Sequence, residues 1–146
     1  MKHSISEIQI SYRPNKLKSN FKITHSQMAY EVILEHWDDD IIELQEEFKI
    51  LLLNNSNEPL GIHCLSKGGI TFAGVDLRIL FAIALKSGAT GLITVHNHPS
   101  GRLIPSQADK NIYNRIKQSC DILNLNYLDN LIITKNGYFS FMDENL

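Results

Sequence analysis

The chain has 146 residues, of which 43% are hydrophobic and 21% charged, and its formal net charge is −2. These values are typical of a single globular domain with its own core, and they exclude a largely disordered chain. The near-zero net charge gives no general attraction to phosphate backbones, so we do not expect nucleic acid as a partner. No stretch approaches the ~20 apolar residues of a membrane span, and the N-terminus lacks a signal-peptide pattern, so we expect a cytoplasmic protein with no membrane partner.

The first part of the chain predicts a strand and then a helix. Residues 4–13 alternate, with Ile8, Ile10 and Tyr12 on one side, which indicates an edge strand. A polar, basic connection follows, after which Thr24 or Ser26 is in place to cap a helix. The apolar residues of that helix recur at helical spacing: Met28, Ala29, Val32, Ile33 and Trp37. We interpret residues 1–40 as an N-terminal extension and residues 41–146 as the main domain.

A strand is predicted over residues 46–53, where period two places Glu46, Phe48, Ile50 and Leu52 on one face. Lys49 suggests that the opposite face is nearer to water, so Glu46 is expected to point inward. An inward carboxylate is costly unless it is paired or lies near a metal ion. Glu47, on the other face, is most simply an exposed acid at the start of the strand.

The next two elements are a hairpin partner and a helix. The turn-forming residues 54–59 predict that residues 60–66 return beside the previous strand. Gly68 and Gly69 break the chain before residues 70–75. Asp76 is in place to cap a helix that runs to Leu85 and ends at Gly88, with a buried stripe of Leu77, Leu80, Phe81, Ala84 and Leu85.

The most informative stretch follows the apolar segment 91–95, which is expected to be a buried strand. His96 and His98 come at its end, and their spacing of two allows both to point to one side. After seven intervening residues come Ser106 and Asp109, three apart at the start of a predicted helix. Zinc binds imidazole and carboxylate groups, and a catalytic site keeps three protein ligands and one open position. The spacing therefore predicts a zinc site held by His96, His98 and Asp109.

Each part of this pattern also occurs in proteins without a metal ion. Ser106 and Asp109 alone would form a capping box, which needs no metal. A lone histidine in a loop would need no metal either. The letters His-Asn-His are also found in nucleases, but here the triplet ends an apolar strand and continues into Pro-Ser-Gly. The capping box does not account for the paired histidines upstream, so we favour the metal site.

The last part of the chain predicts one long helix and two closing strands. The helix covers residues 106–123, and its inward positions are Ala108, Ile112, Ile116, Cys120 and Leu123. Strands are expected over residues 125–134 and 138–141, joined by a turn. Cys64 and Cys120 form no paired motif, so neither a disulfide nor a thiolate metal site is expected.

The string HNHPSG followed by Pro105, Ser106 and Asp109 resembles the JAMM motif of JAB/MPN-domain metalloproteases, and in particular their RadC-like branch. The resemblance runs from about Gln45 to the C-terminus. It implies an α/β fold of the JAB/MPN (cytidine-deaminase-like) type, a single domain whose mixed β-sheet is flanked by helices. It also implies zinc ligation by His96, His98 and Asp109, support of the reacting oxygen by Ser106, and Glu46 as the acid/base, since the family's glutamate stands two residues before an aromatic.

This chain departs from the family pattern at two places. Asp129-Asn130 stands where an Asp-His pair is usual, and residues 75–78 read Val-Asp-Leu-Arg in place of Val-His-Pro-Arg. Both changes bear on substrate contacts or on hydrogen bonds around the site. Neither removes a proposed zinc ligand.

The expected activity is zinc-assisted hydrolysis of an amide or isopeptide bond in a peptide or protein substrate. Two alternatives stay open: a non-catalytic binding module, and a role in DNA repair, which the RadC resemblance suggests by association. Only the N-terminal residues 1–30, with five basic side chains against Glu7, favour DNA. A zinc deaminase is excluded because its H-x-E and PCxxC signatures are missing. The sequence does not indicate an oligomeric state.

Overall fold

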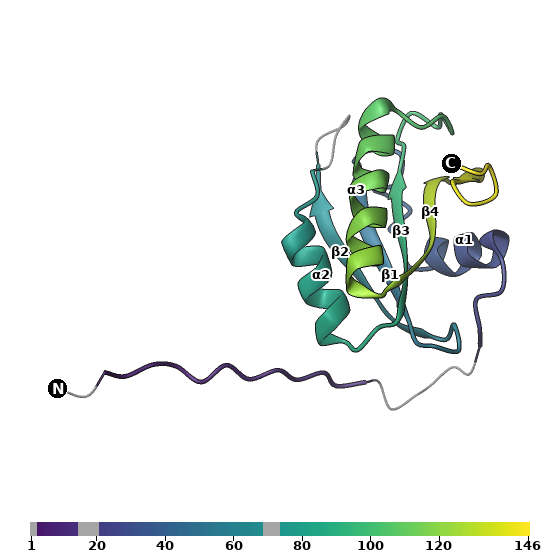
Figure 1. Cartoon of the computed structure of the whole chain (residues 1–146). Coiled ribbons are helices and arrows are strands. Elements are labelled where there is room, and N and C mark those ends of the chain that lie inside the picture. The colour runs from purple at the N-terminus through teal and green to yellow at the C-terminus, as the bar shows by residue number, and fades with distance from the viewer. Residues whose placement is uncertain (1–2, 15–20, 69–73) are drawn as a thin grey trace.

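The computed structural model describes residues 3–14, 21–68 and 74–146. In these residues a five-stranded sheet is combined with helices on both of its faces (Figure 1). The strands are β1 (Glu47–Leu53), β2 (Pro59–Lys67), β3 (Gly91–Asn97), β4 (Asn126–Thr134) and β5 (Gly137–Ser140). The helices are α1 (Ser26–Leu34), α2 (Leu77–Lys86) and α3 (Gln107–Leu123). The expected mixed sheet flanked by helices is confirmed.

The strand order β2-β1-β3-β4-β5 puts β3, which contains His96, at the centre of the sheet between β1 and β4. β1 is antiparallel to both β2 and β3, so the beginning of β1 lies next to the end of β3. β3 and β4 are parallel and are connected through α3. Such a β-α-β unit brings the end of its first strand and the start of its helix to the same edge of the sheet. The hairpin β1–β2 and the closing strands β4 and β5 are confirmed.

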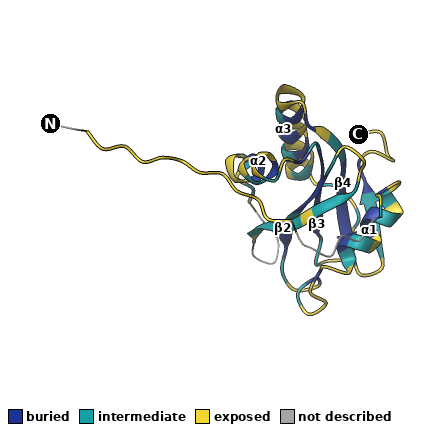
Figure 2. Ribbon diagram, turned by 90° about the horizontal axis from the view of Figure 1, so that it is seen from below, coloured by how far each residue is buried: buried dark blue, intermediate teal, exposed yellow. Residues whose placement is uncertain are grey.

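The two faces of the sheet are covered by different helices (Figure 2). α1 packs on one face through Ala29, Tyr30 and Ile33, against Leu51, Leu53 and Val95. α2 and α3 cover the other face, where Leu80, Phe81 and Ile116 meet Phe48, Ile50 and Leu92. All seven residues of β3 are buried, because both of its faces are covered.

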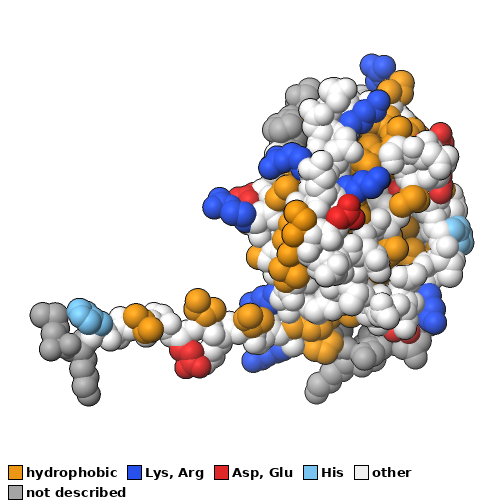
Figure 3. All heavy atoms as spheres, in the orientation of Figure 1, with side chains coloured by type: hydrophobic (Ala, Val, Ile, Leu, Met, Phe, Trp, Pro, Cys, Tyr) orange, Lys and Arg blue, Asp and Glu red, His pale blue; other side chains and the backbone are white. Residues whose placement is uncertain are grey.

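The predicted N-terminal strand is wrong. Residues 3–14 are extended but form no strand, and their side chains are exposed, with Ile8 at 89% and Ile10 at 76% (Figure 3). A strand is stabilised by its cross-strand neighbours, and no described strand pairs with this segment. The alternating pattern favours an extended backbone, but it does not provide a neighbouring strand with which the segment could pair.

The cap of α2 agrees with the sequence prediction, whereas the cap of α1 does not. Asp76 caps α2 by accepting a hydrogen bond from the Arg78 amide at 2.9 Å, and Gly88 follows the helix with φ of +69°, as expected. For α1 the N-cap is His25, with no side-chain cap. Thr24 bonds to the His25 ring and Ser26 to Asp143, so neither hydroxyl caps the helix.

The buried stripes of α2 and α3 differ in detail from the prediction. Leu85 is 52% exposed, and Ala108 and Leu123 are exposed rather than inward. Tyr113 is buried instead, against Phe141. The first turn of α3 extends past the sheet edge, which is why Ala108 faces a pocket and not the core. Most of residues 70–75 lies outside the described residues. None of the described helices combines the length and apolar character needed to cross a bilayer.

Candidate metal site

Four side chains from separate parts of the chain meet at one edge of the sheet. Glu46, His96, His98 and Asp109 each offer a ligand atom, and these atoms all lie within 4.8 Å of one another. The antiparallel register explains the meeting, because Phe48 lies opposite His96 in the β1–β3 pair. Glu46 stands two residues before Phe48, and His98 stands two residues after His96, so both leave this end of the strand pair. Asp109 is brought to this edge by the first turn of α3.

The atomic spacing in this cluster fits a single metal ion. The Nε2 atoms of His96 and His98 are 3.1 Å apart. Asp109 places Oδ1 at 3.1 Å from the His96 Nε2 and Oδ2 at 3.3 Å from the His98 Nε2. Two ligands bound at about 2.0–2.1 Å in a tetrahedral shell would be separated by about 3.3 Å. The residues present therefore match the separation that a metal ion requires of its ligands.

The hydrogen bond on the far side of His98 fixes its tautomer. Its Nδ1 lies 2.7 Å from the Arg102 carbonyl oxygen. A carbonyl only accepts hydrogen bonds, so Nδ1 carries a proton, and in the neutral ring Nε2 presents a lone pair to the cluster. Two buried nitrogen atoms near the cluster have no hydrogen-bond partner among the described residues. They are the Nδ1 of His96 and the Nδ2 of Asn130. Asn130, one of the departures from the family pattern, accepts a hydrogen bond from Thr94 at 2.7 Å.

Ser106 and Asp109 form a capping box at the start of α3. Ser106 Oγ accepts a hydrogen bond from the Asp109 amide at 3.0 Å, and Asp109 Oδ2 accepts one from the Ser106 amide at 2.8 Å. The two interpretations of this pair are therefore compatible, because Asp109 caps the helix and also faces both histidines. The box holds the carboxylate in one orientation, and the Ser106 hydroxyl proton is left available to another acceptor.

The ionisable side chains of the cluster shift one another's pKa values. Burial raises the pKa of Glu46 above its usual range, although His96 and His98 act in the opposite direction. Burial also works to raise the pKa of Asp109, but hydrogen bonds from both histidines outweigh it and hold that pKa well below normal. For His98, burial lowers the pKa, while the bonds to Asp109 and Arg102 raise it more. The site thus combines an ionised aspartate with a glutamate that takes up a proton more readily than usual.

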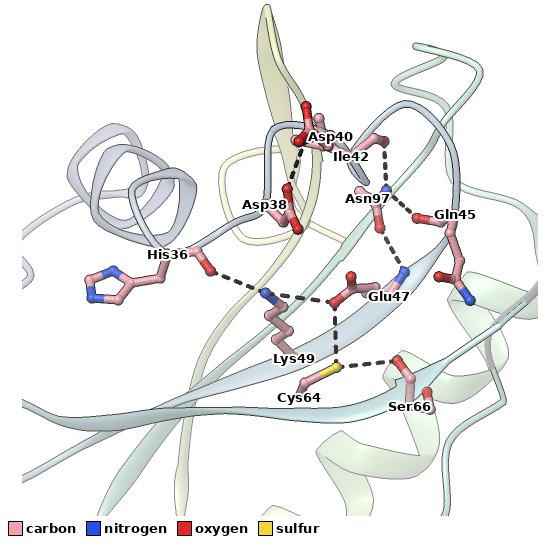
Figure 4. Close-up of polar contacts among 10 residues, drawn as sticks. All are labelled: His36, Asp38, Asp40, Ile42, Gln45, Glu47, Lys49, Cys64, Ser66 and Asn97. Atoms are coloured by element: carbon pink, nitrogen blue, oxygen red, sulfur yellow. Dashed lines mark hydrogen bonds and ion pairs between the residues drawn. The ribbon is translucent and has the colours of Figure 1, made fainter.

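Glu46 and Glu47 face opposite sides of the sheet. The expectation that Glu47 is an exposed acid is wrong, since it is only 3% exposed. Its carboxylate lies 3.7 Å from the Lys49 Nζ and 3.5 Å from the Cys64 sulfur (Figure 4). Lys49 in turn lies over the Trp37 ring and donates to the His36 carbonyl, so the segment after α1 covers this face. Glu46 alone of the two belongs to the metal cluster.

Asn97, between the two histidines, positions the segment that leads to Glu46. It is fully buried and points to the face opposite the cluster. Its Nδ2 donates to the carbonyls of Ile42 and Gln45, and its Oδ1 accepts from the Glu47 amide at 2.7 Å (Figure 4). Sequence reasoning missed this role. The sequence did contain a signal for it, because Asn97 is an amide residue at the end of a buried strand and faces the side opposite to the two histidines.

A pocket of about 370 Å³ adjoins the cluster. Its walls come from the start of β1, the segment before α2 and one face of α3, and its lining residues are Glu46, Phe48, Gly74, Val75, His96, Ala108, Asp109, Asn111, Ile112 and Arg115. A molecule in this pocket would lie against Glu46, His96 and Asp109. Arg115 was not singled out from the sequence, because nothing in its local pattern distinguishes it from a surface arginine.

Comparison with known proteins agrees with this geometry. The model of the RadC-like JAB domain family matches residues 23–146, further toward the N-terminus than the motif alone indicated. A UPF0758 protein of Flavobacterium johnsoniae is 50% identical over 126 residues, which cover 86% of this chain and 53% of that protein. One from Porphyromonas gingivalis is 38% identical over 125 residues, covering 85% and 54%. This chain spans about half the length of these curated relatives. The chain belongs to the RadC-like JAB domain family.

Proposed function

We propose that this protein is a zinc-dependent metallohydrolase of the JAMM type that cleaves a peptide or isopeptide bond. The observation that supports it most is the buried glutamate beside a ligand set of two imidazoles and one carboxylate. Purely structural metal sites rarely need such an additional carboxylate, whereas hydrolysis needs an acid/base near the reacting water.

Zinc is the metal that this ligand set suits best. Two neutral imidazole nitrogens and one carboxylate oxygen give three protein ligands, which is the usual number in catalytic zinc sites. His96, His98 and Asp109 would hold the ion. When bound, zinc supplies Lewis acidity and lowers the pKa of a coordinated water toward about 7. The hydrogen bond from His98 to the Arg102 carbonyl would keep the ring oriented for binding.

Glu46 and Ser106 have complementary roles in this proposal. Glu46 accepts the proton of the attacking water and delivers it to the leaving nitrogen. The Ser106 hydroxyl donates a hydrogen bond to the oxygen that becomes negative as the carbonyl is attacked. Its Oγ remains an acceptor for the Asp109 amide, so capping and catalysis do not compete.

The test is metal content and peptide cleavage measured on the same preparations. The wild-type chain, loaded with zinc and freed of excess metal, should contain about one ion and cleave members of a peptide library. Glu46→Gln should keep the zinc and lose cleavage. His98→Ala should lose the zinc, as measured by atomic spectroscopy. Full cleavage by Glu46→Gln would reassign the base, and one tightly held zinc in His98→Ala would refute the ligand set.

A further inference from the structure

The pocket beside the metal cluster has a distinct distribution of chemical groups. Phe48, Val75, Ala108 and Ile112 give it apolar walls. The charged groups that line it are Glu46 and Asp109 on the side of the cluster and Arg115 on α3. A divalent cation at the cluster would balance the two carboxylates. The positive charge of Arg115 would then have no counterion within the pocket.

Three basic residues of the described part of the chain have acidic partners, whereas Arg115 is among those that have none, and it is the one lysine or arginine that lines the pocket. Arg78 pairs with Asp76, Lys49 with Glu47 and Lys135 with Glu43. No described carboxylate forms an ion pair with Arg115, although this residue borders the pocket. Its backbone is held by α3 and its carbonyl accepts from Ser119, so the side chain is presented from a fixed element.

We infer that Arg115 binds a carboxylate group of the substrate. This inference rests on the proposed function and gives it a substrate class: a peptide that carries a carboxylate close to the bond that is cut. A planar guanidinium binds a carboxylate through two parallel hydrogen bonds, and the apolar walls suit the methylene groups of a glutamate-like side chain.

The helix sets the distance between the carboxylate and the reacting bond. Asp109 and Arg115 are six residues apart on α3, which corresponds to about 9 Å along the axis. An extended peptide advances about 3.4 Å per residue. The arginine side chain shortens the gap, so the carboxylate belongs one or two residues from the scissile bond. It is either an acidic side chain or the C-terminal carboxylate of a short peptide.

The inference can be tested by binding, without turnover. The probes are blocked pentapeptides of glycine with glutamate or glutamine at the centre, and a third peptide with central glutamine and a free C-terminal carboxylate. Each is titrated by calorimetry or NMR into zinc-loaded Glu46→Gln protein. We expect the glutamate peptide to bind roughly tenfold more tightly than its glutamine counterpart. Tighter binding of the third peptide would instead identify the C-terminal carboxylate as the group that is bound.

The matched variants are Arg115→Gln and Lys110→Gln, each combined with Glu46→Gln. Both side chains are exposed and both variants remove one positive charge from α3, but Lys110 does not line the pocket. The preference for a carboxylate should disappear in the first and persist in the second. A preference that survives Arg115→Gln, or no preference at all, would overturn the inference. Tighter binding of adenosine monophosphate than of any peptide would overturn it in favour of a phosphate ligand.

Failure of the proposed hydrolase activity would give a different result. In that case the wild-type, zinc-loaded chain cleaves no library peptide, while the binding preference still depends on Arg115. If the chain does cleave, Arg115→Glu should shift the library profile from acidic to basic residues at one position. Cleavage with an unchanged profile in that variant would refute the role of Arg115 and leave the hydrolase intact.

Discussion

Asp109 takes part in two interactions that can be separated by mutation. Its carboxylate accepts a hydrogen bond from the Ser106 amide and also faces the Nε2 atoms of both histidines. Ser106→Ala removes the cap acceptor and leaves the carboxylate. Asp109→Asn leaves an amide oxygen that can still accept from Ser106, but it removes the negative charge. We predict that the first variant loses stability and keeps metal binding, and that the second loses metal binding.

The magnitudes follow from the two contacts. Loss of an N-cap acceptor costs about 1 kcal/mol, which lowers the midpoint of thermal unfolding by about 3 °C in a domain of this size. Zinc at 100 times its dissociation constant stabilises the folded state by about 2.7 kcal/mol. Ser106→Ala should therefore lower the midpoint equally with and without zinc. Asp109→Asn should show little rise in its midpoint when zinc is added, and its metal-free midpoint should fall as well, because the negative charge that both histidines contact is lost.

Differential scanning calorimetry on metal-free and zinc-loaded samples measures all four midpoints. Wild-type protein gives the reference shift, and circular dichroism checks that each variant is folded. An unchanged zinc shift in Asp109→Asn would exclude Asp109 as a ligand. A zinc shift lost in Ser106→Ala would mean that the serine acts on the metal site directly, and capping and metal binding would then not be separable.

Four further predictions concern single residues. Glu46→Gln should lower turnover by at least about 100-fold while zinc stays bound. Glu47→Gln, on the opposite face, should lower the stability of the fold and keep turnover per folded molecule. Equal losses of turnover in the two variants would contradict this assignment. Because the pKa of His98 is raised above 6.5, its protonated form stabilises the metal-free fold below about pH 6.5, and this contribution is lost as the pH rises through the folded-state pKa. Zinc needs the neutral ring, so the apparent zinc affinity, measured against a chelating indicator, should fall as the pH drops below that pKa and level off above it; a flat profile would refute this. Asn97→Ala should lower the free energy of unfolding by about 3 kcal/mol and lower turnover more than zinc affinity, and denaturant titration beside metal analysis separates the two. Ile33→Ala should cost about 2–5 kcal/mol in the same titration, since Ile33 is fully buried between α1 and the sheet; a loss under about 1 kcal/mol would place α1 outside the core.

The elements nearest the site were the most predictable from sequence. β3 is a short apolar run between a glycine and a turn, and such a run is buried in most folds. The start of α3 carried its own signal, because Ser106 and Asp109 satisfy backbone amides that any helix leaves unpaired. In both places the local preference and the tertiary structure agree, so the ligand spacing could be read directly. At β1 the predicted strand, 46–53, begins one residue before the observed one, Glu47–Leu53.

Prediction failed where the outcome depended on a partner distant in sequence. The segment 4–13 has the alternating pattern of a strand, but a strand needs a second strand to pair with, and the pattern does not specify one. The sequence predicts an exposed Glu47 because Lys49 follows on the same face. The structure shows the two side chains paired beneath the segment after α1, where Lys49 extends over Trp37. Periodicity assigns a residue to a face of a strand, but it does not say what covers that face.

The same limit applies to the pairing that assembles the site. Period two separates Glu46 from Glu47, yet only the β1–β3 register decides which of them meets the histidines. A shift of one residue would exchange the two faces and bring Glu47 toward His98. Asn97 opposes such a shift, because its three hydrogen bonds tie the end of β3 to the first residue of β1 and to the segment just before it. The residue between the two histidines thus links the ligands on one strand to the glutamate on the other. This link explains why an uncharged, buried asparagine stands between the two histidines without facing the candidate metal site.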